Sequence, residues 1–127
     1  MDSNSIFEAT FEESLFLIDP PTTVILNIAW NRVTEPERIQ LSKILNAIKQ
    51  GTSRVRIVYQ EKLDLNRLID QPNKIITFGF ELNGLNLYEP IQLESKHIVL
   101  AESLTTLLTK DEARKKLWLA LRPIFGV

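Results

Sequence analysis

Few side chains of this 127-residue chain are suited to chemistry. Cysteine is absent and His97 is the single histidine, so the sequence excludes thiolate zinc sites, cysteine catalysis and centres with several histidine ligands. Glu81 and Glu102 are candidates for an acid–base pair, but no spacing rule fixes their separation. Gly79 and Gly84 lack the Lys-Ser/Thr that completes a phosphate-binding loop. We therefore expect no catalytic residue, no metal and no cofactor.

A second group of polar and aromatic residues comes directly after two predicted strands. It consists of Trp30, Asn31, Arg32, Phe80, Glu81 and Asn83. Open α/β sheets bind ligands outside the carboxyl ends of their strands, where the strand order reverses. An aromatic pair with an arginine, a carboxylate and amides would suit a planar polar ligand in a crevice at that place. The alternative is that these are solvated loop charges and that Trp30 covers the core.

An apolar stripe near the N-terminus is a candidate for binding a partner protein. Residues 5–18 open with a Ser5/Glu8 capping box and predict an amphipathic helix. Its stripe consists of Phe7, Phe11, Leu15 and Ile18. Four such side chains must be buried, because removing each from water is worth about 1.5–3 kcal/mol. They pack either on the sheet or last helix of their own chain, or in a groove of another protein.

Basic side chains do not dominate the chain. Fifteen Lys and Arg residues face sixteen Asp and Glu, which argues against strong direct binding to nucleic acid or to an anionic membrane. The densest basic cluster is Lys110, Arg114, Lys115 and Lys116. It could meet phosphates, but Asp111 and Glu112 interrupt it, so we favour the solvated face of a helix.

Four strands and several helices are needed to place these residues. Apolar runs predict strands at 22–29, 54–59, 74–78 and 97–101, and 91–93 is a further short candidate. The longer helices are predicted at 35–50, opened by a Thr34/Glu37 capping box, and at 110–122, opened by Thr109/Glu112. Shorter ones follow Asp64 and Ser103. We expect Gly51 to cap the first long helix and Pro123 to end the last.

The alternation of strands and helices predicts an α/β fold. Strands separated by helices form a mainly parallel sheet that is covered on both faces, so we expect a three-layer α/β/α domain with a four-stranded sheet in the order 2-1-3-4. Residues 1–127 then form one domain, and residues 1–21 are an amphipathic segment that precedes the sheet. The predicted core is Val24, Leu26, Ile28, Leu41, Ile44, Leu45, Ile48, Ile57, Ile75, Ile76, Val99, Leu117 and Leu121.

The N-terminal sequence has no sign of export. It lacks a basic start and is acidic where a signal peptide would be apolar. The longest uncharged stretch, residues 20–30, is too short to span a bilayer. We therefore expect a cytoplasmic protein with no membrane contact.

Residues 22–125 resemble a known family. A strand ends in Phe78-Gly79, a later strand is followed by Glu102-Ser103-Leu104, and the last helix carries the pair Leu117-Trp118. With the first strand and helix, ILNIAWNRVTEPERIQLSKIL, this pattern resembles the psi subunit of bacterial DNA polymerase III and small psi-like proteins. The resemblance implies a non-catalytic accessory protein of the replicase. Its partners would be subunits of the clamp-loader assembly, which psi contacts through its N-terminal segment.

The resemblance also bears on enzymatic activity, because psi proteins are similar in fold to uracil-DNA glycosylases. That enzyme family has a water-activating acid after its first strand, where this chain has Trp30-Asn31-Arg32. It also has a His-Pro-Ser-Pro-Leu-Ser segment after its last strand, where this chain has Ser103-Leu104 without the histidine. The resemblance thus implies the scaffold without the chemistry. The alternative function is a degenerate glycosylase-like domain that binds a nucleotide or base.

Overall fold

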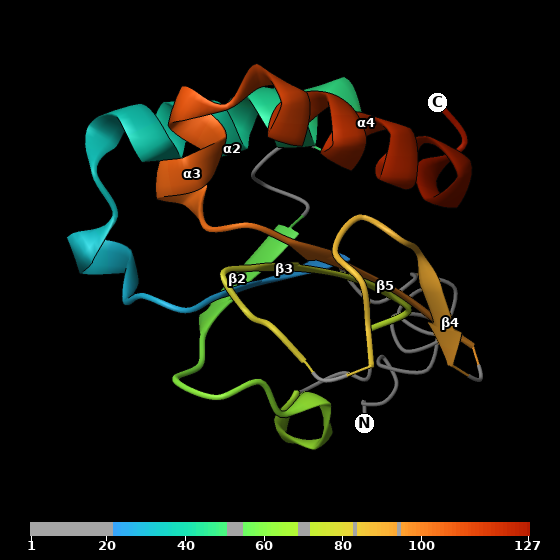
Figure 1. Ribbon diagram of the computed structural model, residues 1–127. Coiled ribbons are helices and arrows are strands. Elements are labelled where there is room, and N and C mark those ends of the chain that lie inside the picture. The colour runs from blue at the N-terminus through green and yellow to red at the C-terminus, as the bar shows by residue number, and fades with distance from the viewer. Residues whose placement is uncertain (1–21, 51–54, 69–71, 83, 94) are drawn as a thin grey trace, which may run out of the picture.

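One five-stranded sheet, in the order β2-β1-β3-β5-β4, forms the centre of the molecule (Figure 1). The computed structural model describes residues 22–50, 55–68, 72–82, 84–93 and 95–127. The strands are β1 Thr22–Leu26, β2 Val55–Tyr59, β3 Lys74–Phe78, β4 Ile91–Leu93 and β5 Lys96–Ala101. Four of them are parallel, and β4 runs antiparallel to β5. The protein is therefore α/β with a mostly parallel sheet, as predicted.

The predicted strand count and order are wrong, because Ile91–Leu93 joins the sheet as a fifth strand beyond β5. Only two residues of the sequence lie between the end of β4 at Leu93 and the start of β5 at Lys96. So short a connection can only join antiparallel strands, since parallel strands need a crossover of a dozen or more residues. Residues 91–93 were a further strand candidate with these bounds, but the predicted four-stranded sheet left them out. Strand β1 also ends three residues earlier than predicted.

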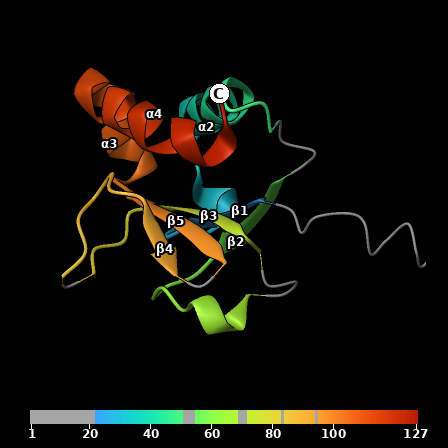
Figure 2. The ribbon, with the colours of Figure 1, turned by 90° about the vertical axis from the view of Figure 1, so that its right-hand side faces the viewer.

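The helices are arranged differently from the prediction. They are α2 Glu35–Ala47, α3 Leu104–Thr109 and α4 Asp111–Phe125, with 3₁₀ turns η1 Trp30–Arg32 and η3 Leu65–Arg67. Figure 2 shows α2, α3 and α4 together on one face of the sheet and η3 on the other. A three-layer α/β/α arrangement needs α-helices on both faces. In the described residues the second helical layer is missing, because the described part of the connection from β2 to β3 contains only a 3₁₀ turn.

Helix α2 begins as its sequence predicts. The Thr34 hydroxyl accepts from the Glu37 N–H at 3.4 Å, and the Glu37 carboxylate accepts from the Thr34 N–H at 2.9 Å. This confirms the capping box. The helix ends with Lys49 at a φ of 63° and with the Gln50 N–H donating to the Leu45 carbonyl at 2.9 Å. The predicted end at residue 50 is wrong, because α2 stops at Ala47 and its C-cap is Ile48. Gly51 itself lies outside the described residues.

Both predicted ends of the last helix are wrong. Lys110 is both the C-cap of α3 and the N-cap of α4, and it makes no side-chain cap because an ammonium group cannot accept a hydrogen bond. The Thr109 hydroxyl donates instead to the Thr106 carbonyl at 3.2 Å. At the other end Pro123 lies inside α4, which continues to Phe125 and stops at Gly126 with a φ of 67°. The helix continues past the proline because Ile124 and Phe125 still pack on the core.

The core lies on both faces of the sheet. On the helical face, Val24, Ile76 and Val99 pack against α2 and α4, and on the other face Ile25, Ile75 and Leu100 pack with Leu68 and Phe80. Ten of the thirteen predicted core residues are buried, and Ile28, Ile44 and Ile57 are partly buried against the same cluster. The predicted N-terminal helix and its stripe lie outside the described residues. In the described part of the chain, no helix combines the length and the apolar composition needed to cross a membrane.

Candidate functional site

The strand order reverses between β1 and β3, where a ligand crevice was predicted. The Asn27 side chain lies there and donates from Nδ2 to the Gly79 carbonyl at 3.3 Å. Gly79 has a φ of 91°, and a Cβ at this position would lie 2.5 Å from the Asn27 side chain. Asn27 and Gly79 are thus in close contact across the ends of the two strands.

The residues that were predicted to line this crevice lie on different elements. Trp30, Asn31 and Arg32 form η1, where the Arg38 guanidinium lies 4.6 Å from the centroid of the Trp30 ring. Arg38 also donates to the Trp30 carbonyl at 2.7 Å, which holds η1 against α2. Phe80 is buried in the core after β3, whereas Glu81 is exposed. Asn83 lies outside the described residues.

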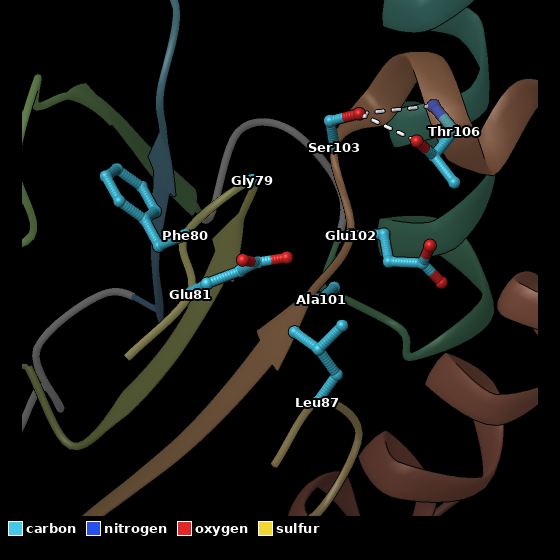
Figure 3. A pocket seen from close by; sticks show the side chains of 8 residues that line it. All are labelled: Gly79, Phe80, Glu81, Leu87, Ala101, Glu102, Ser103 and Thr106. Carbon is cyan, nitrogen blue, oxygen red and sulfur yellow. Dashed lines mark hydrogen bonds between the residues drawn. The ribbon is translucent and has the colours of Figure 1, made fainter. Parts of the chain in front are cut away.

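A pocket of about 330 Å³ lies one strand further along, at the carboxyl ends of β3 and β5 (Figure 3). Its lining is Gly79, Phe80, Glu81, Leu87, Ala101, Glu102, Ser103 and Thr106. In Figure 3 the Glu81 carboxylate points toward the end of β5, whereas the Glu102 carboxylate points away from Glu81. Phe80 and Glu81 from the predicted crevice therefore line this pocket.

Glu102 is held by neighbours rather than presented to a ligand. The Tyr88 hydroxyl donates to Glu102 Oε1 at 2.9 Å and accepts from the Glu102 N–H at 3.2 Å. Lys110 Nζ lies 4.0 Å from Glu102 Oε2. Burial, with a smaller contribution from the Glu102 carboxylate, raises the pKa of Tyr88 to about 12, so the phenol stays protonated and keeps donating at neutral pH.

The two hydroxyl side chains of the pocket also have hydrogen-bond partners within the protein. Ser103 is the N-cap of α3, and its hydroxyl accepts from the Thr106 N–H at 3.2 Å and lies 3.0 Å from the Thr106 hydroxyl. His97 is the second residue of β5, at the far end of the strand from the pocket, as predicted. No group of three potential metal ligands exists among the described residues. Within these residues, the pocket brings together no nucleophile with a base.

A second candidate surface is a groove of about 230 Å³ between α2 and α4. It is lined by Gln40, Lys43, Ile44 and Ala47 of α2 and by Arg114, Leu117, Trp118 and Leu121 of α4. Both sets are spaced as i, i+3, i+4 and i+7, so each helix presents one continuous face to the groove. Trp118 is 36% exposed there, and its neighbour Leu119 is 63% exposed. Such an apolar surface between two helices is typical of a contact with a third helix.

A buried carboxylate fixes the helices that form the groove. The Glu37 carboxylate of α2 accepts from the Thr105 hydroxyl of α3 at 2.5 Å and from the Thr34 hydroxyl at 2.9 Å. Burial raises the pKa of Glu37, but the hydrogen bonds from Thr105 and Thr34 outweigh it, so the pKa lies below its ordinary value. Glu37 is therefore charged at neutral pH and joins α2 to the segment that leads into α4.

The predicted basic cluster does not form a uniform basic patch. The Arg114 guanidinium donates to the carbonyls of Leu107 and Leu108 and pairs with Asp111, so it joins α3 to α4. Lys115 and Lys116 are exposed. Lys115 lies three residues before Trp118 and Arg122 lies four after it, with its guanidinium 6.0 Å from the centroid of the Trp118 ring. The α4 side of the groove is thus flanked by cations on both sides of Trp118.

Comparison of the chain with models of protein families, with curated proteins and with solved structures found no match. The site is therefore defined by its geometry alone. Sequence reasoning missed the groove, although α4 carries a signal of it. Leu117 and Leu121 would suffice to bury the helix, and the adjacent Trp118 and Leu119 widen its apolar face beyond what one contact needs.

Proposed function

We propose that this protein is a non-catalytic interaction module that binds another protein through the groove between α2 and α4. The observation that carries the proposal is the exposed Trp118 in an apolar groove formed by matched faces of two helices. Large aromatic side chains at the centre of a concave surface contribute most to the binding energy of interfaces. Lys43 and Arg122 lie at its margins and supply charged contacts around the apolar centre.

Binding of a nucleotide or base at the strand ends is the less well supported alternative. The close contact of Asn27 with Gly79 lies between β1 and β3, where that ligand was expected. The pocket between β3 and β5 carries Glu81 and Glu102, and two carboxylates repel the phosphates of a nucleotide. We also propose a scaffold that is similar to uracil-DNA glycosylases but lacks glycosylase activity. It is supported by the relative order of the parallel strands, β2-β1-β3-β5.

The resemblance to psi proteins names the first partners to test. We propose a psi-like accessory role in the clamp-loader assembly of DNA polymerase III, in which the groove or the N-terminal segment contacts a clamp-loader subunit. The support for this finer proposal is the sequence pattern around Leu117-Trp118, the same pair that brings Trp118 into the groove.

The experiment compares one variant inside the groove with one outside it. Trp118→Ala removes the exposed aromatic side chain of α4. Tyr59→Ala removes another exposed aromatic side chain, 51% exposed against 36% for Trp118, from strand β2. Tagged full-length proteins are used to capture partners from the native host, and binding to purified clamp-loader subunits of that host is measured by calorimetry.

We expect wild type and Tyr59→Ala to bind the same partner with similar affinity, and Trp118→Ala to lose at least tenfold, the order of an interface hot spot. Thermal unfolding checks that all three proteins are folded. Equal binding by Trp118→Ala and wild type would exclude the groove as the partner site. Binding that is confined to proteins outside the clamp-loader assembly would support the module and reject the psi-like role.

A further inference from the structure

The charges of the chain are divided unevenly between its N-terminal segment and the rest. Residues 1–21 contain five acidic residues and no Lys or Arg. All fifteen basic residues and the other eleven acidic residues follow after residue 21, which gives that part a formal charge of +4. Opposite charges on two parts of one chain attract each other and favour contact between them.

We propose that residues 5–18 of the chain bind as a helix in its own groove between α2 and α4 and compete there with the partner protein. The inference rests on the proposed function, because it names a regulator of the same surface. The groove has the form of a helix pair that lacks a third helix, since both walls are helical faces with i, i+3, i+4 and i+7 spacing.

The apolar face of the segment is long enough to cover the whole groove. The stripe from Phe7 to Ile18 extends about 16 Å along a helix, at 1.5 Å per residue. Each wall, for example Gln40 to Ala47 of α2, extends about 10 Å. Two or three of the four stripe residues can therefore reach Trp118 and its neighbours while the rest lie at the end of the groove.

The charges at the margins of both surfaces match. On a helix, Glu8 and Glu12 lie one turn apart along the same side of the stripe. On α4, Lys115 and Arg122 lie on the exposed side, one turn before and one turn after Trp118. Lys43 adds an exposed cation on the α2 wall. An acidic amphipathic helix is thus the occupant that the groove favours on charge.

The described chain begins close to one end of the groove. Thr22, its first residue, donates from its hydroxyl to the Gln50 side chain at 3.0 Å. Gln50 follows three residues after Ala47, the residue of α2 that lines the groove nearest its C-terminal end. Only three residues separate Ile18 from Thr22, so the segment is tethered at this end of the groove, and a tethered segment binds at a high effective concentration.

The test uses the full chain with Trp118 as the reporter. Trp30→Phe leaves Trp118 as the single tryptophan. In this background we expect Phe7→Ala with Phe11→Ala to shift the Trp118 emission to longer wavelength and to raise its quenching by acrylamide. Phe16→Ala is the matched control, because Phe16 lies off the stripe, and we expect it to leave both readings unchanged. An unchanged Trp118 in the double variant would overturn the inference.

Charge reversal is a second, independent test of the same contact. Lys115→Glu with Arg122→Glu should expose Trp118 in the same way, and adding Glu8→Lys with Glu12→Lys should protect it again. Failure of this restoration would contradict the charge match. Sedimentation separates contact within one chain from exchange between two copies. A wild-type monomer supports the proposal, and a dimer that dissociates on Phe7→Ala with Phe11→Ala would overturn it.

The partner measurement distinguishes failure of this inference from failure of the proposed function. If the segment closes the groove in about 90% of molecules, its release raises the apparent affinity for the partner about tenfold. Loss of binding in Trp118→Ala without any effect of the Phe7 and Phe11 changes leaves the function standing and rejects the competitor. If those changes expose Trp118 but partner binding does not depend on the groove, the competitor stands and the proposed function is rejected.

Discussion

Replacing Gly79 with alanine tests the contact that fills the junction between β1 and β3. Gly79 has a φ of 91°, and the new Cβ would lie 2.5 Å from the Asn27 side chain. Two costs therefore add. A side chain in left-handed backbone costs about 1–2 kcal/mol. Displacing Asn27 also breaks its hydrogen bond to the Gly79 carbonyl, worth about 0.5–1.5 kcal/mol.

Gly84 provides the matched control, because its φ of 82° is similar and no atom lies within 4 Å of its Cβ position. Gly84→Ala thus carries the backbone cost alone. We expect Gly79→Ala to lower the free energy of unfolding by about 1.5–3.5 kcal/mol, and Gly84→Ala by about 1–2 kcal/mol. In an Asn27→Ala background the difference between the two should vanish.

Urea unfolding followed by circular dichroism measures all of these variants, with the m-value as a check that the unfolded states are comparable. Equal losses at Gly79 and Gly84 in the wild-type background would refute the steric reasoning. So would a difference that persists after Asn27 has been truncated, because the contact partner is then gone.

Three further predictions concern the buried groups. Leu45→Ala removes a fully buried side chain of α2 and should lower the free energy of unfolding by about 2–5 kcal/mol, measured in urea. Glu37→Gln should cost about 1.5–3 kcal/mol at neutral pH. Because the pKa of Glu37 is lowered on folding, its contribution is present above the ordinary value of 4.5 and is lost as the pH falls through the lower value. Melting curves of wild type and Glu37→Gln should therefore converge in acid, and a constant gap would contradict the assignment. In a pH titration followed by phenol absorbance, one tyrosine should ionise near pH 12, and this step should be absent in Tyr88→Phe. The raised pKa of Tyr88 also means that its contribution to stability is complete below pH 10 and is lost between pH 10 and about 12.

Much of the fold follows from local patterns in the sequence. The strand 74–78 was predicted with its observed bounds, because a β-branched apolar run between a proline and a glycine leaves little choice. The Thr34/Glu37 capping box was also predictable from local sequence, because its two hydrogen bonds join residues three apart. Patterns of this kind need no knowledge of the rest of the chain.

The errors lie where distant contacts decide. Residues 91–93 were a candidate strand, but their place in the sheet depends on pairing with β5, which their own short pattern does not reveal. Pro123 is kept in α4 because Ile124 and Phe125 still pack on the core after it. The site shows the same limit. Phe80 and Glu81 follow β3 as expected, but the position of Trp30 depends on Arg38, which holds η1 against α2.

The two edges of the sheet differ in how they are protected. At one edge, β4 covers the first half of β5, and the Tyr88 N–H then donates to the Leu100 carbonyl at 2.9 Å, so the loop before β4 continues the cover. At the other edge, β2 pairs with β1. Strand edges are templates for association with other chains, and a very short edge strand limits such association. The three-residue length of β4 therefore protects the β4 side of the sheet from aggregation by strand pairing.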